Sequence, residues 1–122
     1  MTITQLKFVG IPTRDQDRAL AFWTEQVGFA VLTDQPMGEQ RWIELGIPGA
    51  ETAIVLFTPD GQDDRIGTFF NGSFECNDIA ETYCVMSERG VQFEAPPVAQ
   101  PWGTFAKFFD PDGNSFVLSS RG

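Results

Sequence analysis

The order of secondary-structure signals repeats once along the chain, and this repeat constrains the fold more than any other feature. In each half, an apolar run of strand formers precedes a stretch with helical spacing, and three further strand-like runs follow. The two helical stretches end at Gly28 and Gly90, which lie 62 positions apart in a chain of 122 residues. A unit that recurs in this way predicts two modules of βαβββ order.

The first module is predicted to span residues 1–59. Its helix begins at a cap, Thr13 or Asp15, and ends at Gly28, and Trp23 lies on the apolar helix face that we expect in the core. Pro36 is predicted to lie in a loop, because proline cannot donate to a strand ladder. The expected strands are Gln5–Ile11, Phe29–Leu32, Arg41–Leu45 and Thr52–Phe57, the last apolar enough to be buried on both faces.

The second module is predicted to span residues 67–122, after a polar, turn-rich linker at residues 60–66. Asp78 and Glu81 form a variant of the capping box at the start of its helix. Aligning the two helix-ending glycines places Phe8 near Phe70 and Asp15 on Asn77. The expected strands are Thr68–Glu75, Val91–Phe93, Thr104–Phe109 and Ser115–Ser119, with an extended, proline-rich connection at 96–101 and a tight turn at 110–114.

Charge and composition exclude several classes of partner. The net charge of -9 repels phosphate backbones and anionic lipid surfaces, so we expect no nucleic acid or membrane partner. The N-terminus shows no signal-peptide pattern, and Cys76 and Cys84 are expected to be reduced thiols, so a cytoplasmic location is predicted. The chain has no histidine, which removes the commonest metal ligand and the commonest general base.

Two sets of motifs carry a family resemblance that covers nearly the whole chain. The first half has Phe8–Pro12, then Arg14–Trp23, then Val27–Phe29, and the second half has Arg89–Phe93, Gln100–Gly103 and Phe109–Asn114. Together they resemble the vicinal oxygen chelate superfamily, which includes glyoxalase I, bleomycin resistance proteins and extradiol dioxygenases. The resemblance implies an α+β fold, one domain over 1–122 in which two βαβββ modules form a curled, open barrel-like mixed sheet with a cleft, and a homodimer.

The resemblance also implies a divalent metal held by His, Gln or Glu on cleft-facing strands. The corresponding positions fall on Phe8, near Val55, on Asn71 (or on Phe70 with a one-residue slip) and on Val117. Phenylalanine and valine have no donor atoms for a metal ion. We therefore expect neither a metal site nor another cofactor, and neither metal-dependent glyoxalase nor dioxygenase activity.

The cleft implied by the resemblance is expected to be apolar, and two functions are open for it. The first is metal-free binding of an aromatic or cationic small molecule, with Trp42 and Trp102 as stacking walls. The second is a metal-independent lyase, isomerase or epimerase, with Glu44 as the candidate general base. Alternatively, the same residues fill a core or a dimer interface, and Arg41, Glu44 and Lys107 face solvent or pair. The predicted ligand-binding residues are Phe8, Trp42, Val55, Phe57, Asn71, Trp102, Lys107 and Val117.

Overall fold

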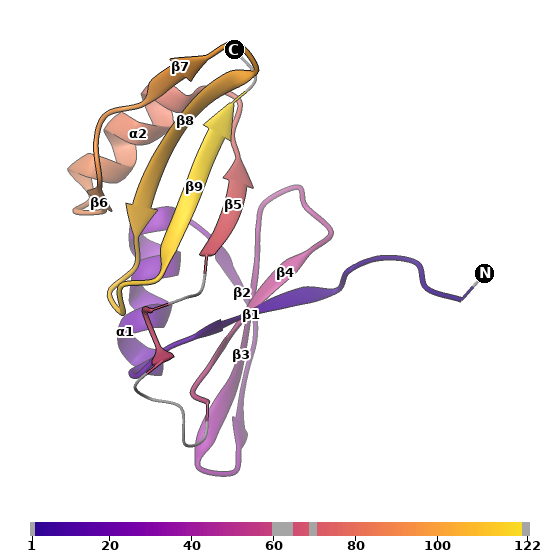
Figure 1. Ribbon diagram of the computed structural model, residues 1–122. Helices are drawn as coiled ribbons and strands as arrows, with labels where there is room; N and C mark the ends of the chain where they lie inside the picture. The colour runs from indigo at the N-terminus through magenta and orange to yellow at the C-terminus, as the bar shows by residue number, and fades with distance from the viewer. Residues whose placement is uncertain (1, 60–64, 69–70, 121–122) are drawn as a thin grey trace. The chain divides into compact units, whose positions relative to one another are not determined.

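The computed structural model describes residues 2–59, 65–68 and 71–120 (Figure 1). The chain divides into two compact units, residues 1–64 and 65–122. Each unit has one mixed sheet and helical segments between its first and second strands, which confirms the α+β class and the βαβββ modules. The first five residues of the predicted linker, 60–64, lie outside the described residues, as does Phe70.

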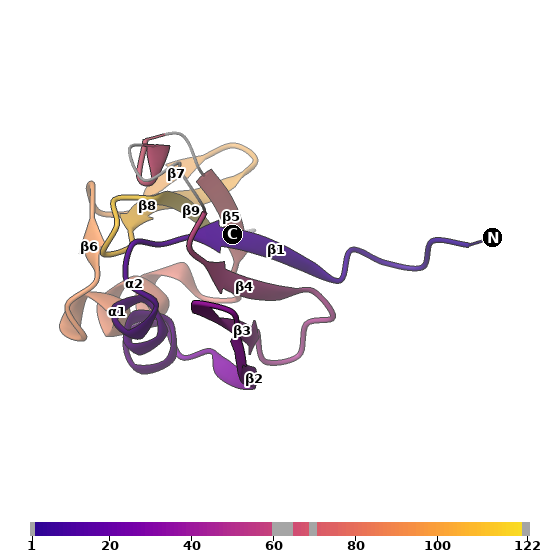
Figure 2. The same cartoon turned by 90° about the horizontal axis from the view of Figure 1, so that it is seen from below.

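The first unit has a four-stranded sheet with strand order β1-β4-β3-β2, and Figure 2 shows the strands side by side in this order. Strand β1 runs parallel to β4, whereas β3 is antiparallel to both of its neighbours. The elements are β1 (Phe8–Pro12), α1 (Gln16–Ala21), a π-helical turn η1 (Phe22–Val27), β2 (Ala30–Met37), β3 (Gln40–Gly46) and β4 (Ala53–Phe57).

The core of the first unit lies between the sheet and its helix. Ile43 and Leu45 of β3 are fully buried, and Phe22 and Trp23 are buried on the helix. Alternate strand residues point to one face, and helical residues three or four apart share one side, so these two periods build the core. Burial of Trp23 confirms its predicted core position. All four residues from Ala53 to Leu56 are buried, which confirms that β4 is buried on both faces.

The stretch from the capping aspartate to the helix-ending glycine is one residue longer in the first unit (Asp15 to Gly28) than in the second (Asp78 to Gly90), and the π turn accounts for the difference. Both helices begin at capping aspartates, Asp15 and Asp78, whose side chains accept backbone N–H groups three residues later. Because each π turn takes up one residue more than an α turn, η1 absorbs the extra position. The predicted alignment of Asp15 with Asn77 is therefore wrong by one residue. The caps align with each other, and the first residue of β1, Phe8, aligns with Asn71, the first residue of the opening strand of the second unit.

Strand β2 is longer than the sequence predicts. It continues through Pro36 to Met37, where a loop was expected, and the turn to β3 falls at Gly38 and Glu39. The reason is the position of β2 at the edge of the sheet. A proline on an edge strand removes no ladder hydrogen bond if its nitrogen faces away from the neighbouring strand.

The second unit has strands in the order β5-β9-β8-β6, with β7 also paired to β8. Strands β6 and β7 pair with different stretches of β8, so the proline-rich connection, predicted as merely extended, contains a short strand. Helix α2 contacts β8 and β9 on one face of this sheet (Figure 1). The elements are β5 (Asn71–Glu75), α2 (Ile79–Glu88), β6 (Gln92–Phe93), β7 (Val98–Gln100), β8 (Gly103–Phe109) and β9 (Ser115–Ser120).

Phenylalanine rings form the core of the second unit. Phe108 of β8 and Phe116 of β9 stack with ring centroids 5.3 Å apart. Phe74 of β5 and Phe93 of β6 pack against Phe108 at 6.2 and 5.7 Å. The four rings come from β5, β6, β8 and β9, so their packing fixes the register of these strands in the sheet.

The turn between β8 and β9 is held by a buried carboxylate. Asp110 Oδ1 accepts the backbone N–H groups of Asp112 (3.0 Å) and Asn114 (2.9 Å), and Oδ2 accepts the Asn114 side-chain amide at 2.9 Å. The Asn114 Oδ1 atom in turn accepts the Gly67 backbone N–H at 3.2 Å. The predicted tight turn at 110–114 is confirmed, and it anchors a second segment of the chain.

We expect Asp110 to make the stability of the protein depend on pH. Burial raises the pKa of Asp110 to about 6, although hydrogen bonds from Asn114 and Asp112 act in the opposite direction. Because the folded state then binds this proton more tightly than the unfolded state, the contribution of Asp110 to the free energy of unfolding falls as pH rises from about 4 to about 7.

Urea denaturation of the wild type and of Asp110→Asn across this pH range measures the effect. Asparagine does not titrate, so the wild type minus the variant isolates the carboxyl group. The difference in the free energy of unfolding is expected to decrease from acidic to neutral pH. A difference that stays constant or increases would contradict the raised pKa.

Candidate ligand-binding site

The helix-free face of the first sheet gathers five of the residues singled out from sequence. Arg41 forms an ion pair with Asp17 of α1, so Arg41 and every second residue of β3 from it face the helix. The residues between them point the other way, and the strand register adds alternate residues of β1 and β4. We call this surface the aromatic face, and it consists of Phe8, Trp42, Glu44, Val55 and Phe57.

Aromatic rings dominate the geometry of this face. The rings of Phe8 and Trp42 meet edge to face with centroids 5.4 Å apart and planes at 81°. The ring of Phe57 lies over Gly10, where a Cβ atom would come within 2.9 Å of a ring carbon, so glycine lets this ring approach the backbone. Val55 is 2% exposed, whereas the three rings are half-buried. The aromatic face therefore has the buried Val55 side chain surrounded by three partly exposed rings.

Glu44 is the carboxylate of the aromatic face. It pairs in register with Val55 on β4 and Thr33 on β2, and it is half-buried. The Trp42 indole N–H donates to Glu44 Oε1 at 3.4 Å, a long hydrogen bond. The indole orientation is therefore fixed by Phe8 on one side and Glu44 on the other.

Arg41 does not take part in this site, and it pairs with acidic residues, which is one of the alternatives left open from sequence. Its guanidinium donates to both carboxylate oxygens of Asp34, at 3.0 and 2.9 Å, and also pairs with Asp17. The hydrogen bond from Arg41 lowers the pKa of Asp34 below its usual value. Arg41 is thus engaged on the helix side of the sheet.

The other predicted ligand-binding residues lie in the second unit. Lys107 and Val117 are register partners on β8 and β9, and with Phe105 and Val98 they line a cavity of about 200 Å³. The Lys107 ammonium lies 3.7 Å from a Glu94 oxygen. Trp102 is 73% exposed in the turn between β7 and β8.

Asn71 opens β5, with its backbone opposite Ser115 on β9, and its side chain is outside the described part of the structure. Predicted ligand-binding residues therefore occur in both units.

The positions implied for a metal do not suit one. Phe8, Val55 and Val117 present hydrocarbon side chains, which have no lone pairs to donate. Among the described residues, no group of three or more His, Cys, Asp and Glu side chains is close enough to hold a metal ion. The donor set of the described residues therefore does not fit the divalent cation that the resemblance implies.

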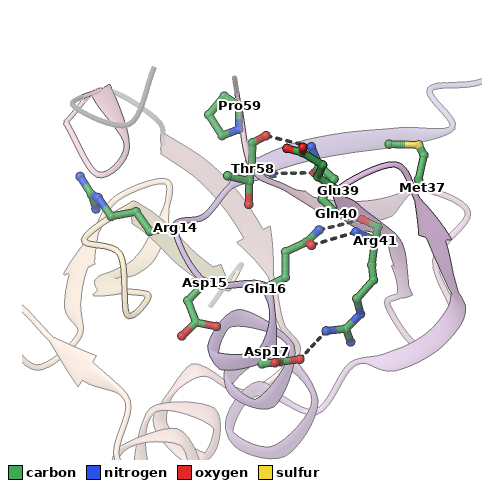
Figure 3. A pocket seen from close by; sticks show the side chains of 10 residues that line it. All are labelled: Arg14, Asp15, Gln16, Asp17, Met37, Glu39, Gln40, Arg41, Thr58 and Pro59. Carbon is green, nitrogen blue, oxygen red and sulfur yellow. Dashed lines mark hydrogen bonds and ion pairs between the residues drawn. The ribbon is translucent and has the colours of Figure 1, made fainter. Parts of the chain in front are cut away.

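A polar cavity of about 760 Å³ beside the start of α1 was not anticipated from sequence (Figure 3). The side-chain amides that line this cavity form hydrogen bonds within the protein. Gln16 exchanges two hydrogen bonds with the Arg41 backbone, at 2.7 and 3.0 Å, and Gln40 does the same with Thr58, at 3.1 and 3.0 Å. The two glutamine side chains thus take the place of strand hydrogen-bond partners where β3 begins and β4 ends, so we assign this cavity a structural role. Its lining residues are Arg14, Asp15, Gln16, Asp17, Met37, Glu39, Gln40, Arg41, Thr58 and Pro59.

Comparison with known proteins identifies the family. The model of the Glyoxalase/Bleomycin resistance protein/Dioxygenase superfamily matches residues 5–118. The chain belongs to this superfamily. The resemblance seen in the motifs, and the fold that it implied for each module, are confirmed.

Similar proteins match nearly the whole chain. "Uncharacterized protein YetH" of Bacillus subtilis (strain 168) is 41% identical over 117 residues, covering 95% of this chain and 98% of that protein. The crystal structure of TnmS3, an antibiotic binding protein from Streptomyces sp. CB03234, superposes with a TM-score of 0.89 at 33% identity, covering 100% of this chain and 99% of TnmS3.

A superfamily member from Sphaerobacter thermophilus DSM 20745 superposes with a TM-score of 0.87 at 33% identity, covering 98% of this chain and 99% of that one.

None of the helices among the described residues is long and apolar enough to span a membrane.

Proposed function

We propose that this protein binds a small, planar organic molecule on the aromatic face and that it does so without a metal ion. The observation that carries this proposal is the placement of three partly exposed rings, Phe8, Trp42 and Phe57, around the buried side chain of Val55. Small-molecule sites combine apolar and aromatic linings with few polar groups. The similarity to TnmS3, an antibiotic binding protein, supports ligand binding as the function of this chain.

The physical basis of binding is the stacking of the ligand on aromatic rings that are poorly hydrated. A well-placed aromatic pair contributes about 0.5–1.5 kcal/mol beyond the burial of its area. Trp42 has the largest ring on the face, and its orientation is fixed by contacts to Phe8 and Glu44. A ring held in place before binding loses little conformational freedom when the ligand arrives.

We also propose that the protein is a cytoplasmic homodimer. Two free thiols, Cys76 and Cys84, support a reducing compartment. Exposed apolar side chains, among them Ile3, Leu32 and Trp102, support burial against a second copy. Sedimentation velocity would give a single species of about 27 kDa for a dimer of the 13.5 kDa chain.

Replacing Trp42 by alanine is expected to weaken ligand binding at least about tenfold, because the largest stacking surface is lost. A panel of planar aromatic compounds would first be screened by thermal shift on the wild type. The affinities of the compounds that bind would then be measured by titration calorimetry for the wild type and for Trp42→Ala.

The matched control is Val31→Ala, which shortens an exposed apolar side chain of β2 that pairs with Leu45 and not with the aromatic face. Its affinity is expected to stay within about twofold of the wild type. If no compound of the panel shifted the melting temperature, or if Trp42→Ala bound as well as the wild type, the proposed site would be refuted.

A metal-independent lyase, isomerase or epimerase is a second candidate function, because Glu44 is a carboxylate on the same face as the rings. Glu44 would act as a general base that takes a proton from a carbon acid stacked on Trp42. Prolonged incubation of the wild type with each bound compound, followed by mass spectrometry and by proton exchange in deuterated water, tests this. Unchanged compounds without deuterium uptake would leave binding as the function.

A further inference from the structure

We propose that Asp110, Asn114 and Gly67 form a pH-sensitive latch. The latch holds residues 65–68 on the turn between β8 and β9 while Asp110 is ionised, and it releases them when Asp110 takes up a proton from solvent. All of these residues belong to the second unit, so the proposal does not depend on the proposed binding function. It follows from the direction of two hydrogen bonds in series and from the burial of the groups that form them.

The hydrogen bonds of the latch run in one direction. The Gly67 backbone N–H donates to Asn114 Oδ1 at 3.2 Å, and the Asn114 side-chain amide donates to Asp110 Oδ2 at 2.9 Å. An ionised carboxylate can only accept hydrogen bonds. The charge of Asp110 therefore orients the Asn114 amide, with its nitrogen toward Asp110 and its oxygen toward Gly67.

A proton on Asp110 reverses this direction. Asp110 Oδ1 already accepts the backbone N–H groups of Asp112 and Asn114, so the proton is placed on Oδ2, which faces the Asn114 side chain. The new O–H group needs an acceptor, and the Asn114 amide offers its oxygen only if oxygen and nitrogen exchange places. The amide nitrogen then faces the Gly67 N–H, and two donors cannot share a hydrogen bond. The contact to Gly67 is lost.

Burial and close packing convert this loss into movement of the segment. Asp110 is 6% exposed and Asn114 is fully buried, so bulk water does not replace the lost partner. Gly67 lies so close to the turn that a Cβ atom on it would come within 2.1 Å of the Asp112 carbonyl oxygen. Two facing donors therefore have no room to separate unless residues 65–68 move away from the turn.

The released state is a local opening of the segment and not unfolding of the unit. Residues 65–68 form one turn, in which the Thr68 backbone N–H donates to the Arg65 carbonyl oxygen at 3.1 Å. The Ile66 side chain is 2% exposed and anchors this turn independently of pH. The segment is thus held by one apolar contact and by one polar contact that depends on the charge of Asp110.

The charged groups around the latch favour a transition in the range of physiological pH. Burial raises the pKa of Asp110 to about 6, and the negative charge of Asp112 acts in the same direction. Arg65, at the start of the segment, is exposed, and Lys107 of β8 pairs with Glu94. We expect the latch to be closed above about pH 7 and open below about pH 5.

Amide hydrogen exchange, followed by NMR on the full-length protein, tests the proposal. After correction for the intrinsic exchange rate at each pH, the protection of the Gly67 amide is expected to fall at least about tenfold from about pH 7.5 to about pH 5. The Cys76 amide, which donates to the Ser119 carbonyl oxygen at 2.8 Å, is the internal control. Its protection is expected to change by less than about twofold. The chemical shift of the Asp110 carboxyl carbon should follow the same midpoint as Gly67.

Two variants separate the role of Asp110 from a general effect of charge in the turn. In Asp110→Asn, an amide N–H takes the place of the carboxyl O–H, so the Gly67 amide is expected to have low protection at both pH values. Asp112→Asn removes the neighbouring charge and keeps the latch. Its pH dependence is expected to persist with a midpoint at lower pH, because one cause of the raised pKa of Asp110 is gone.

The proposal is overturned if the Asp110 carbon titrates while the protection of Gly67 stays constant, because the Asn114 amide then keeps its orientation. It is equally overturned if the Asp110 carbon does not titrate between about pH 4.5 and about pH 8. A pH dependence that persists in Asp110→Asn would assign the proton to another group. If Asp110→Asn does not fold, the comparison of the Gly67 and Asp110 midpoints in the wild type decides.

Discussion

Replacing Gly67 by alanine is expected to destabilise the protein by about 3–5 kcal/mol. Gly67 has a φ of +82° and lies against the turn that joins β8 and β9. A Cβ atom at this position would come within 2.1 Å of the Asp112 carbonyl oxygen, so one of the two backbones must move. That movement breaks the hydrogen bond from the Gly67 N–H to Asn114 Oδ1, and Asn114 is fully buried.

Urea denaturation followed by circular dichroism measures this loss, and Gly113→Ala is the matched control. Gly113 lies in the same unit with a similar φ of +90°, but a Cβ atom there would meet its nearest neighbour at 3.7 Å, an ordinary contact. The control is expected to cost only the backbone strain of about 1–2 kcal/mol. Equal effects of the two substitutions would show that the close approach of Gly67 to Asp112 contributes nothing.

Truncating Phe108 to alanine is expected to cost about 3–5 kcal/mol in the free energy of unfolding. Phe108 is 1% exposed, and its ring packs against Phe74, Phe93 and Phe116. Alanine would leave a cavity at the point where rings from all four main strands meet. A loss of this size is a large fraction of the total stability of a typical domain.

Phe109→Ala is the control, because Phe109 follows Phe108 on β8 and points to the opposite, half-buried face. It removes a ring of the same size that makes a contact to Lys107, 5.7 Å from the ring centroid. We expect a cost below about 2 kcal/mol. If the two truncations cost the same, the phenylalanine cluster would not be the main core of the second unit.

Features set by local chemistry could be predicted from the sequence. Asp15 and Asp78 cap their helices, Gly28 and Gly90 follow them, and the 110–114 turn is held by Asp110, because each depends on contacts within a few residues. The order of helices and strands could be predicted for the same reason, because the spacing of apolar residues is also a local property of the sequence.

Features set by position in the sheet could not be predicted. Pro36 lies in a strand only because β2 is an edge strand. Residues 98–100 form a strand only because an edge of β8 is available to pair with them. The π turn adds a residue inside an otherwise ordinary helical pattern, so period alone does not show it.

Residues of the candidate site could be proposed from the sequence, but not the side of the sheet on which each charged residue lies. Motif spacing proposed Phe8 and Val55, strand alternation added Phe57, and Trp42 and Glu44 were singled out as an aromatic and a charged residue within an otherwise apolar strand. Alternation also separates Arg41 from Glu44, but it does not say which of the two faces the helix. The ion pairs of Arg41 with Asp34 and Asp17 settle this, and they join residues that are not neighbours in the sequence.

The extra residue in η1 has a consequence for exchanging segments between the two halves of the chain. Before this turn, equivalent positions differ by 63, as for Phe8 and Asn71, and after it they differ by 62, as for Val55 and Val117. A chimera joined with one constant offset would move one set of strands by a residue, and every side chain in that set would then point to the wrong face. Working chimeras therefore need both crossover points on the same side of the π turn, or the turn must be transferred with the helix.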